Sequence, residues 1–173
     1  MDRTLLSLGA SGECEQHAKF EDDTPCGLGV LPDGKLVVLT MFRKRLMTYT
    51  DGQLSLYADL SGIATGTIDD MIVDGLGRAY VMKAPDGICL DHEEAVWVAS
   101  FDEDAFIRVS RDGRDLQRME VPGRRAIACV LGGPARRTLF CLSAATSPEQ
   151  LRQRRSSARI DVVDVEIPGA GYP

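Results

Sequence analysis

Short apolar stretches separated by polar turns run along most of the chain. Four of these stretches are rich in Val, Leu, Thr and Tyr, the residue types that favour strands, and they cover residues 27–31, 35–40, 45–49 and 53–60. The triplets PDG at 32–34 and TDG at 50–52 lie between them. Asp followed by Gly is typical of a tight turn, because the Asp side chain can accept a hydrogen bond from the backbone two residues on and Gly tolerates a positive φ. The pattern therefore predicts antiparallel strands joined by turns.

The same strand and turn signals continue through the rest of the sequence. They cover residues 69–81, 86–100, 105–121, 126–143 and 158–167. Only the segment 147–158 reads as helical, with Ser147 at the N-cap position and Pro148 in the first turn. The sequence thus predicts an all-β fold with one short helix.

An internal repeat organises these strands. Four segments read as an apolar strand, a polar turn and a second apolar strand, and the first and third of them continue into two further strands. Four antiparallel strands in about 40 residues are typical of one blade of a β-propeller. The repeat predicts a full blade at 25–60, a half blade at 61–83, a full blade at 84–121, and a terminal half blade with a C-terminal strand at 122–173. About three blades are too few to close a propeller ring within one chain.

Composition narrows the classes of function. The chain has 173 residues and a formal net charge of −6, which gives no electrostatic footprint for nucleic acid or an anionic membrane. No apolar run approaches the roughly 20 residues of a membrane span, and the N-terminal residues lack the apolar core of a signal peptide. The five cysteines are an odd number without a CxxC pair. We expect a cytoplasmic protein with reduced thiols, of which Cys89, Cys129 and Cys141 are buried in apolar strands.

Several segments resemble one known family. The stretches APDGICLDHEEAVWVAS (84–100), ACVLGGPARRTLFCLSA (128–144) and ARIDVVDVEIPGAGYP (158–173) look like the senescence-marker-protein (regucalcin)/gluconolactonase/luciferin-regenerating-enzyme family. The resemblance covers most of residues 25–173 and implies part of a six-bladed β-propeller. Residues 1–24 are then the remnant of a first blade, and a further family stretch is missing between Lys83 and Ala84.

The resemblance also implies one divalent cation, Ca²⁺, Zn²⁺ or Mg²⁺, in the channel of the propeller. In the family, a Glu near the N-terminus, two Asn and the Asp of a PDG motif hold the ion. Asp86 of APDGICLD matches that Asp, Asp69 stands where the family has one of the Asn, and Glu13 matches the Glu. The chain contains no Asn, so we expect the cation to be weakly held, because affinity for a hard cation follows the number of oxygen ligands.

Two interpretations of Asp86 stay open on the sequence alone. Its carboxylate could bind the cation and act as general base on a water molecule. It could instead cap a turn before the segment GICL at 87–90.

Two functions from different classes follow. The first is a divalent-metal-dependent hydrolase of a lactone or small cyclic ester, gluconolactonase-like, with Asp86 as general base and a lactone or sugar-acid-like molecule as substrate. The second is a non-catalytic propeller fragment that serves as a binding or self-association module. Since an incomplete ring leaves strand edges unpaired, we expect a homo-oligomer joined through open sheet edges, with no nucleic-acid or membrane partner.

Overall fold

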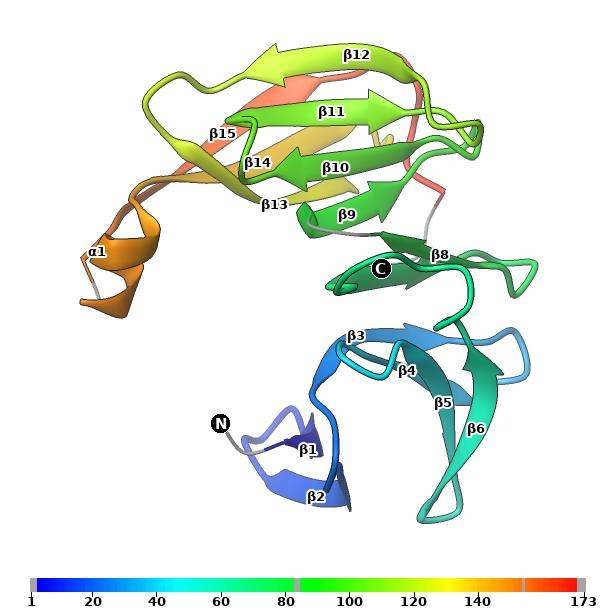
Figure 1. Ribbon diagram of the computed structural model, residues 1–173. Helices are drawn as coiled ribbons and strands as arrows, with labels where there is room; N and C mark the ends of the chain where they lie inside the picture. The colour runs from blue at the N-terminus through cyan, green and yellow to red at the C-terminus, as the bar shows by residue number, and fades with distance from the viewer. Residues whose placement is uncertain (1–2, 83–84, 154, 171–173) are drawn as a thin grey trace. The chain divides into compact units, whose positions relative to one another are not determined.

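The computed structural model describes residues 3–82, 85–153 and 155–170. The chain divides into two compact units, Met1–Lys83 and Ala84–Pro173, which we call the N-terminal and C-terminal units (Figure 1). The division falls between Lys83 and Ala84, the position at which the family resemblance implies a missing stretch.

The N-terminal unit contains three antiparallel sheets. A two-stranded sheet pairs β1 (Thr4–Leu8) with β2 (Cys14–Lys19). A four-stranded sheet runs in the order β3 (Pro25–Val30), β4 (Leu36–Thr40), β5 (Arg45–Thr50) and β6 (Gln53–Asp59). A second pair joins β7 (Asp70–Val73) to β8 (Ala79–Met82). Each sheet is a meander, because strands that are consecutive in the chain are neighbours in the sheet.

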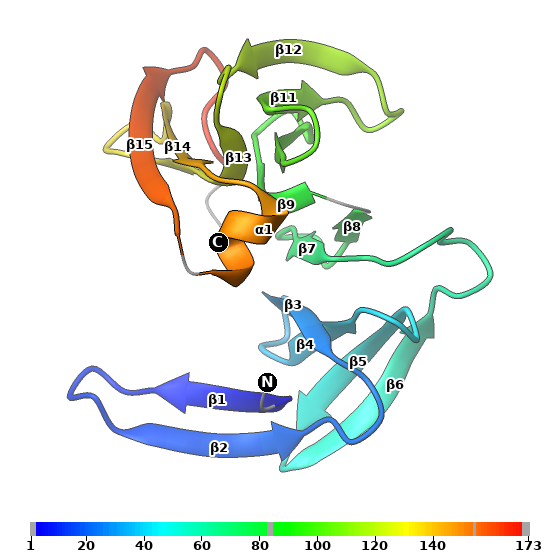
Figure 2. The same ribbon diagram turned by 60° about the vertical axis from the view of Figure 1, so that its left-hand side comes forward.

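The C-terminal unit contains two antiparallel sheets. The first consists of β9 (Pro85–Leu90), β10 (Val96–Ser100), β11 (Ala105–Val109) and β12 (Asp115–Glu120). The second consists of β13 (Arg125–Gly132), β14 (Thr138–Ala145) and β15 (Ser157–Asp164), and it lies against the first (Figure 2). The helix α1 (Pro148–Arg152) connects β14 to β15.

The prediction of strands with one short helix is confirmed. The Ser147 hydroxyl accepts a hydrogen bond from the backbone N–H of Gln150 at 3.2 Å, as expected for an N-cap. The helix is shorter than the predicted segment 147–158, because Ser157 already pairs with Ala145 as the first residue of β15. Within the described part of the chain, no helix has the length and apolar character needed to cross a membrane.

Neighbouring sheets approach each other through glycine in the first strand. A Cβ built on Gly87 of β9 would lie 2.8 Å from the Cα atom of Ala128 in β13. In the N-terminal unit, a Cβ on Gly27 of β3 would lie 2.6 Å from Cγ of Met71 in β7. Contacts this short do not occur between real side chains, so glycine is required where the first strands of two adjacent sheets meet.

The apolar core of the C-terminal unit fills the space between its two sheets. Trp97, Phe106 and Leu139 are its largest fully buried side chains. The prediction of buried thiols is confirmed, because Cys89, Cys129 and Cys141 are free cysteines in the same core.

The segment after β15 ties the two sheets of this unit together. The N–H of Val165 donates to the carbonyl of Arg137 at 2.8 Å, at the turn between β13 and β14. The N–H of His92 donates to the carbonyl of Pro168 at 2.8 Å, and Asp91 forms a bridge with Gly169. Residues 165–170 therefore connect the β13–β14 turn to the β9–β10 turn.

We expect Gly87→Ala to destabilise the C-terminal unit by about 1–3 kcal/mol, because the new methyl group meets the backbone of Ala128. The single tryptophan, Trp97, lies in this unit, so denaturant unfolding followed by its fluorescence measures the loss. Gly62→Ala is the matched control, since a Cβ there meets no atom within 4 Å. Equal stability of the two variants would contradict the packing argument.

Candidate functional site

Asp86 lies in a strand. It is the second residue of β9 and its side chain is exposed. The pairing of β9 with β10, which sets Ile88 opposite Val98 and Pro85 opposite Ser100, holds this segment extended. The interpretation of Asp86 as a residue that caps a turn is therefore wrong.

The other PDG triplet of the chain shows what the turn form looks like. Asp33 accepts a hydrogen bond from the N–H of Lys35 at 3.1 Å, and Gly34 has a φ of 84°. Identical triplets adopt different structures because 32–34 connects two paired strands, whereas 85–87 is itself paired within one.

Asp69 lies directly before β7, and its side chain is half-buried. Its backbone N–H donates to the carbonyl of Met82 at 3.3 Å. The Cys26 thiol donates to the carbonyl of the preceding residue, Ile68, at 3.3 Å. Burial, the largest effect, and the negative charges of Asp69, Asp70 and Asp23 together raise the pKa of Cys26 to about 12. The start of β7 is thus an acidic region that keeps this thiol protonated.

Glu13 lies in the exposed turn between β1 and β2. Its carboxylate accepts a hydrogen bond from the Ser11 hydroxyl, which lowers the pKa of Glu13 below its ordinary value. The Glu13 carbonyl accepts a second bond from the N–H of Gly9 at 2.8 Å. These contacts give Glu13 a local role in closing the turn.

The three predicted cation ligands come from both units. Asp86 lies in the C-terminal unit, whereas Asp69 and Glu13 lie in the N-terminal unit, Asp69 directly before β7 and Glu13 in the turn between β1 and β2. Among the residues that the structure describes, no three His, Cys, Asp or Glu side chains are grouped so as to hold a metal ion.

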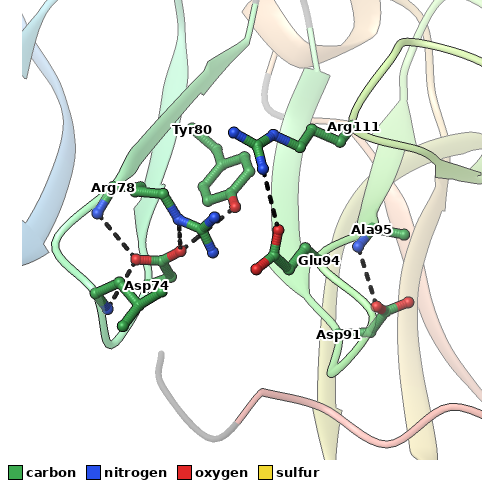
Figure 3. A network of polar contacts seen from close by, with 8 residues as sticks. Asp74, Arg78, Tyr80, Asp91, Glu94, Ala95 and Arg111 are labelled. Atoms are coloured by element: carbon green, nitrogen blue, oxygen red, sulfur yellow. Dashed lines mark hydrogen bonds and ion pairs between the residues drawn. The ribbon is translucent and has the colours of Figure 1, made fainter.

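Two buried aspartates that the motif analysis did not single out each accept several hydrogen bonds (Figure 3). In the N-terminal unit, Asp74 accepts hydrogen bonds from the N–H of Leu76 at 2.9 Å, from the N–H of Arg78 at 2.9 Å and from Nε of Arg78 at 2.6 Å. In the C-terminal unit, Asp91 accepts from the N–H of Ala95 at 3.1 Å and from Nε of Arg108 at 2.6 Å.

Asp74 and Asp91 occupy the same place in two repeats. Each follows the first strand of its sheet and binds the backbone of the residue four positions later. The sequence signal is an Asp directly after an apolar strand, five residues before the first residue of the next strand. These carboxylates organise turns. Their donors are backbone N–H groups, arginine and, for Asp74, the Tyr80 hydroxyl at 3.3 Å, which gives them a structural role.

Comparison with known proteins matches part of the chain to a family model. The family model for the SMP-30/gluconolactonase/LRE-like region matches residues 81–145. That match contains Asp86 and the whole of β9–β14. Residues 81–145 are therefore similar to the SMP-30/gluconolactonase/LRE-like family.

Two curated relatives agree with this assignment. A 6-deoxy-6-sulfogluconolactonase of Pseudomonas putida is 32% identical over 91 residues, which are 51% of this chain and 31% of the relative. A regucalcin of Danio rerio is 36% identical over 61 residues, which are 35% of this chain and 21% of the relative. The chain therefore spans at most about a third of these curated relatives, and the resemblance stated from the sequence is confirmed.

A solved structure supports the fold. The virginiamycin B lyase of Staphylococcus aureus superposes with a TM-score of 0.61 at 15% identity, over 96% of this chain and 64% of that one. The fold class predicted from the repeat, an all-β partial β-propeller, is confirmed. The sheets β3–β6 and β9–β12 each have four strands, and the sheet β13–β15 has three.

We expect the N-terminal unit to lose stability in acid partly through Asp74. Burial, the largest single effect, raises the pKa of this carboxyl, but its hydrogen bonds with Arg78 and Leu76 together hold the pKa below its ordinary value. The unfolded chain then binds the proton first, so the stabilisation is complete above about pH 4 and is lost as the pH falls through the lower folded-state pKa. In thermal melts followed by circular dichroism, Asp74→Asn should flatten this dependence. Asp51→Asn, at an exposed turn of the same unit, should melt like the parent chain at every pH.

Proposed function

We propose that this chain hydrolyses a lactone or small cyclic ester, with Asp86 as the general base. The observation that supports this most is the place of Asp86. It is an exposed carboxylate on the first strand of a four-stranded sheet, inside the region that matches the gluconolactonase family model. The match to the 6-deoxy-6-sulfogluconolactonase spans only 31% of that relative's length. The activity is therefore our proposal for this chain.

The proposed reaction assigns one proton path to Asp86. A carboxylate oxygen of Asp86 takes a proton from water as the water oxygen attacks the carbonyl carbon of the lactone. The ring C–O bond then breaks, and the same carboxyl group returns the proton to the departing alkoxide. The products are one hydroxy acid per lactone and per water consumed.

A divalent cation would polarise the carbonyl when bound. Asp86 and Asp69 offer the hard oxygen atoms that Ca²⁺ and Mg²⁺ prefer. Because the chain contains no Asn, the residue type that the resemblance implies for two of the ligands, we propose that a cation binds weakly.

We expect Asp86→Asn to lower kcat for gluconolactone hydrolysis by about 10² to 10⁴-fold, because the amide cannot accept the proton. The melting temperature should change little, since the side chain is exposed on a paired strand. Asp33→Asn is the matched control, because it makes the same change in the other PDG triplet and should keep the parent rate.

Three results would go against the hydrolase. They are an absence of hydrolysis by the parent chain, an unchanged kcat in Asp86→Asn, and an equal loss in Asp33→Asn. Calorimetric titration with Ca²⁺ tests the cation separately. Tight one-to-one binding would contradict weak binding, and unchanged binding in Asp86→Asn would exclude Asp86 as a ligand.

A second candidate, a self-association module, has its own observation. The face of the sheet β13–β15 that points away from the core carries a cross-strand row of Val130, Phe140 and Val162. These side chains are 50%, 36% and 58% exposed. The strand β15 is also the edge of its sheet in the order β13–β14–β15, and an antiparallel edge can pair with the same edge of a second copy about a two-fold axis.

We therefore expect the chain to form a homodimer through β15. Light scattering coupled to size exclusion should give twice the chain mass of 18.8 kDa. Val162→Lys places a charge on the apolar face and should shift the population to monomer, whereas Leu116→Lys, at another exposed strand position, should not. A monodisperse monomer of the parent chain would contradict the dimer.

A further inference from the structure

The face of the sheet β3–β6 that points away from β7 is only partly covered. Two cross-strand rows run over it, one of Leu28, Val38, Met47 and Leu56 and one of Val30, Leu36, Tyr49 and Leu54. The β1–β2 hairpin packs on the middle of this face, where Leu5 and Phe20 form an apolar core with residues of β4, β5 and β6. Within the described residues, no side chain of β3 belongs to that core. Leu28 and Val30 of β3 are 53% and 55% exposed.

A groove of about 250 Å³ lies between β1 and the uncovered strand β3. It is lined by Thr4 and Leu5 of β1, by residues 25–28 of β3 and by Val38 of β4. Since β1 belongs to a two-stranded sheet, its edge away from β2 has no strand neighbour among the described residues. Every second residue of such an edge leaves its N–H and C=O groups unpaired. In Figure 2, β1 lies between β2 and β3, so this free edge is directed to the groove.

The other sheet interfaces of the chain indicate what would fill the groove. On its other face β3 meets β7, and β9 meets β13, so in both cases one first strand lies against another. On the groove side of β3, no strand of the described part of the chain occupies that place. An extended segment paired with the free edge of β1 would lie there and cover Leu28 and Val30.

The spacing of first strands limits the size of the side chains on such a segment. Gly27 of β3 lies so close to β7 that a Cβ would come within 2.6 Å of Met71. One of two first strands in contact therefore carries residues with little or no side chain. On the groove side β3 carries the large residues Leu28 and Val30. The incoming strand must then supply the small residues, at every second position, because alternate side chains of a strand face the same side.

Carboxylates surround the groove. Cys26, which lines it, lies within the electrostatic influence of Asp23, Asp69 and Asp70. The segment 3–23, which contains β1 and β2, carries more acidic than basic side chains, namely Glu13, Glu15, Glu21, Asp22 and Asp23 against Arg3 and Lys19. Because opposite charges attract, basic residues at the ends of the incoming strand are favoured and acidic ones are disfavoured.

We propose that this groove binds an extended segment of a partner protein, with Gly or Ala at every second position and Lys or Arg at its ends. The segment adds a strand to the free edge of β1, antiparallel to it like the other neighbouring strands of the chain. Its small side chains lie on Leu28 and Val30. This surface contains neither Asp86 nor β15, so the proposal does not depend on the hydrolase or on the homodimer.

Synthetic peptides test the backbone, the size and the charge that the groove requires. In calorimetric titration of the full chain at low ionic strength, Ac-KATATAK-amide should bind saturably with one peptide per chain. Ac-KLTLTLK-amide, which presents leucine to β3, should bind about fivefold more weakly. Ac-EATATAE-amide should also bind about fivefold more weakly, and added salt should reduce this difference. Ac-KATPPAK-amide should not bind, because proline has no N–H to donate to β1.

Two variants of one cross-strand row locate the site. Leu28 and Leu56 lie at opposite ends of the row and are 53% and 56% exposed, so Leu28→Lys and Leu56→Lys should both fold like the parent chain. Leu28→Lys places a positive charge in the groove and should weaken binding of Ac-KATATAK-amide about tenfold. Leu56→Lys should bind it like the parent. Hydrogen exchange of the parent chain should show slower exchange in β1 when the peptide is bound.

The absence of saturable binding of Ac-KATATAK-amide overturns the proposal. So does binding of the leucine, glutamate or proline peptide with equal affinity, or an equal loss of affinity in Leu28→Lys and Leu56→Lys. A second copy of the chain is the alternative occupant. Light scattering would identify it if Leu28→Lys dissociated a dimer that Leu56→Lys left intact while no peptide bound, and the proposal would then be wrong.

Discussion

In both units, the packing of adjacent sheets depends on the close approach of their first strands, β9 with β13 and β3 with β7. Each sheet exposes an apolar face that must be covered by the next sheet, and the two first strands come together more closely than a Cβ on either glycine allows. Gly87 meets Ala128 in the C-terminal unit, and Gly27 meets Met71 in the N-terminal unit. In the C-terminal unit, the core between the two sheets is filled by side chains such as Trp97 and Leu139.

The strands and their grouping could be predicted from the sequence because their signals are local. Alternation of apolar residues and Asp–Gly turns determines where each strand begins and ends, and a repeat of about 40 residues groups the strands into sheets. The helix was predicted too long, since the pairing of Ser157 with Ala145 is a contact between strands and leaves no periodic trace within 147–158.

The candidate site was less predictable, because it depends on contacts between segments distant in the sequence. The triplet PDG is compatible with a turn and with a strand, and only pairing with β10 decides the second form for Asp86. Glu13 fits a ligand position by residue type, yet in the structure it binds Ser11 within its own turn. The cross-strand row of Trp97, Arg108 and Gln117 on β10, β11 and β12 could not be predicted either. The register between two strands does not follow from the residues of one strand alone.

The strap formed by residues 165–170 has a consequence for folding kinetics. The bridge between Asp91 and Gly169 joins positions near the two ends of the C-terminal unit. Contacts of such large sequence separation carry the entropy of closing a long loop, and they form slowly. Glu166 and Ile167 of this strap line one side of a cavity of about 400 Å³ whose other side is formed by residues of β10–β12. That side of the cavity therefore forms late, and a partly folded C-terminal unit can have all of β9–β12 in place without it.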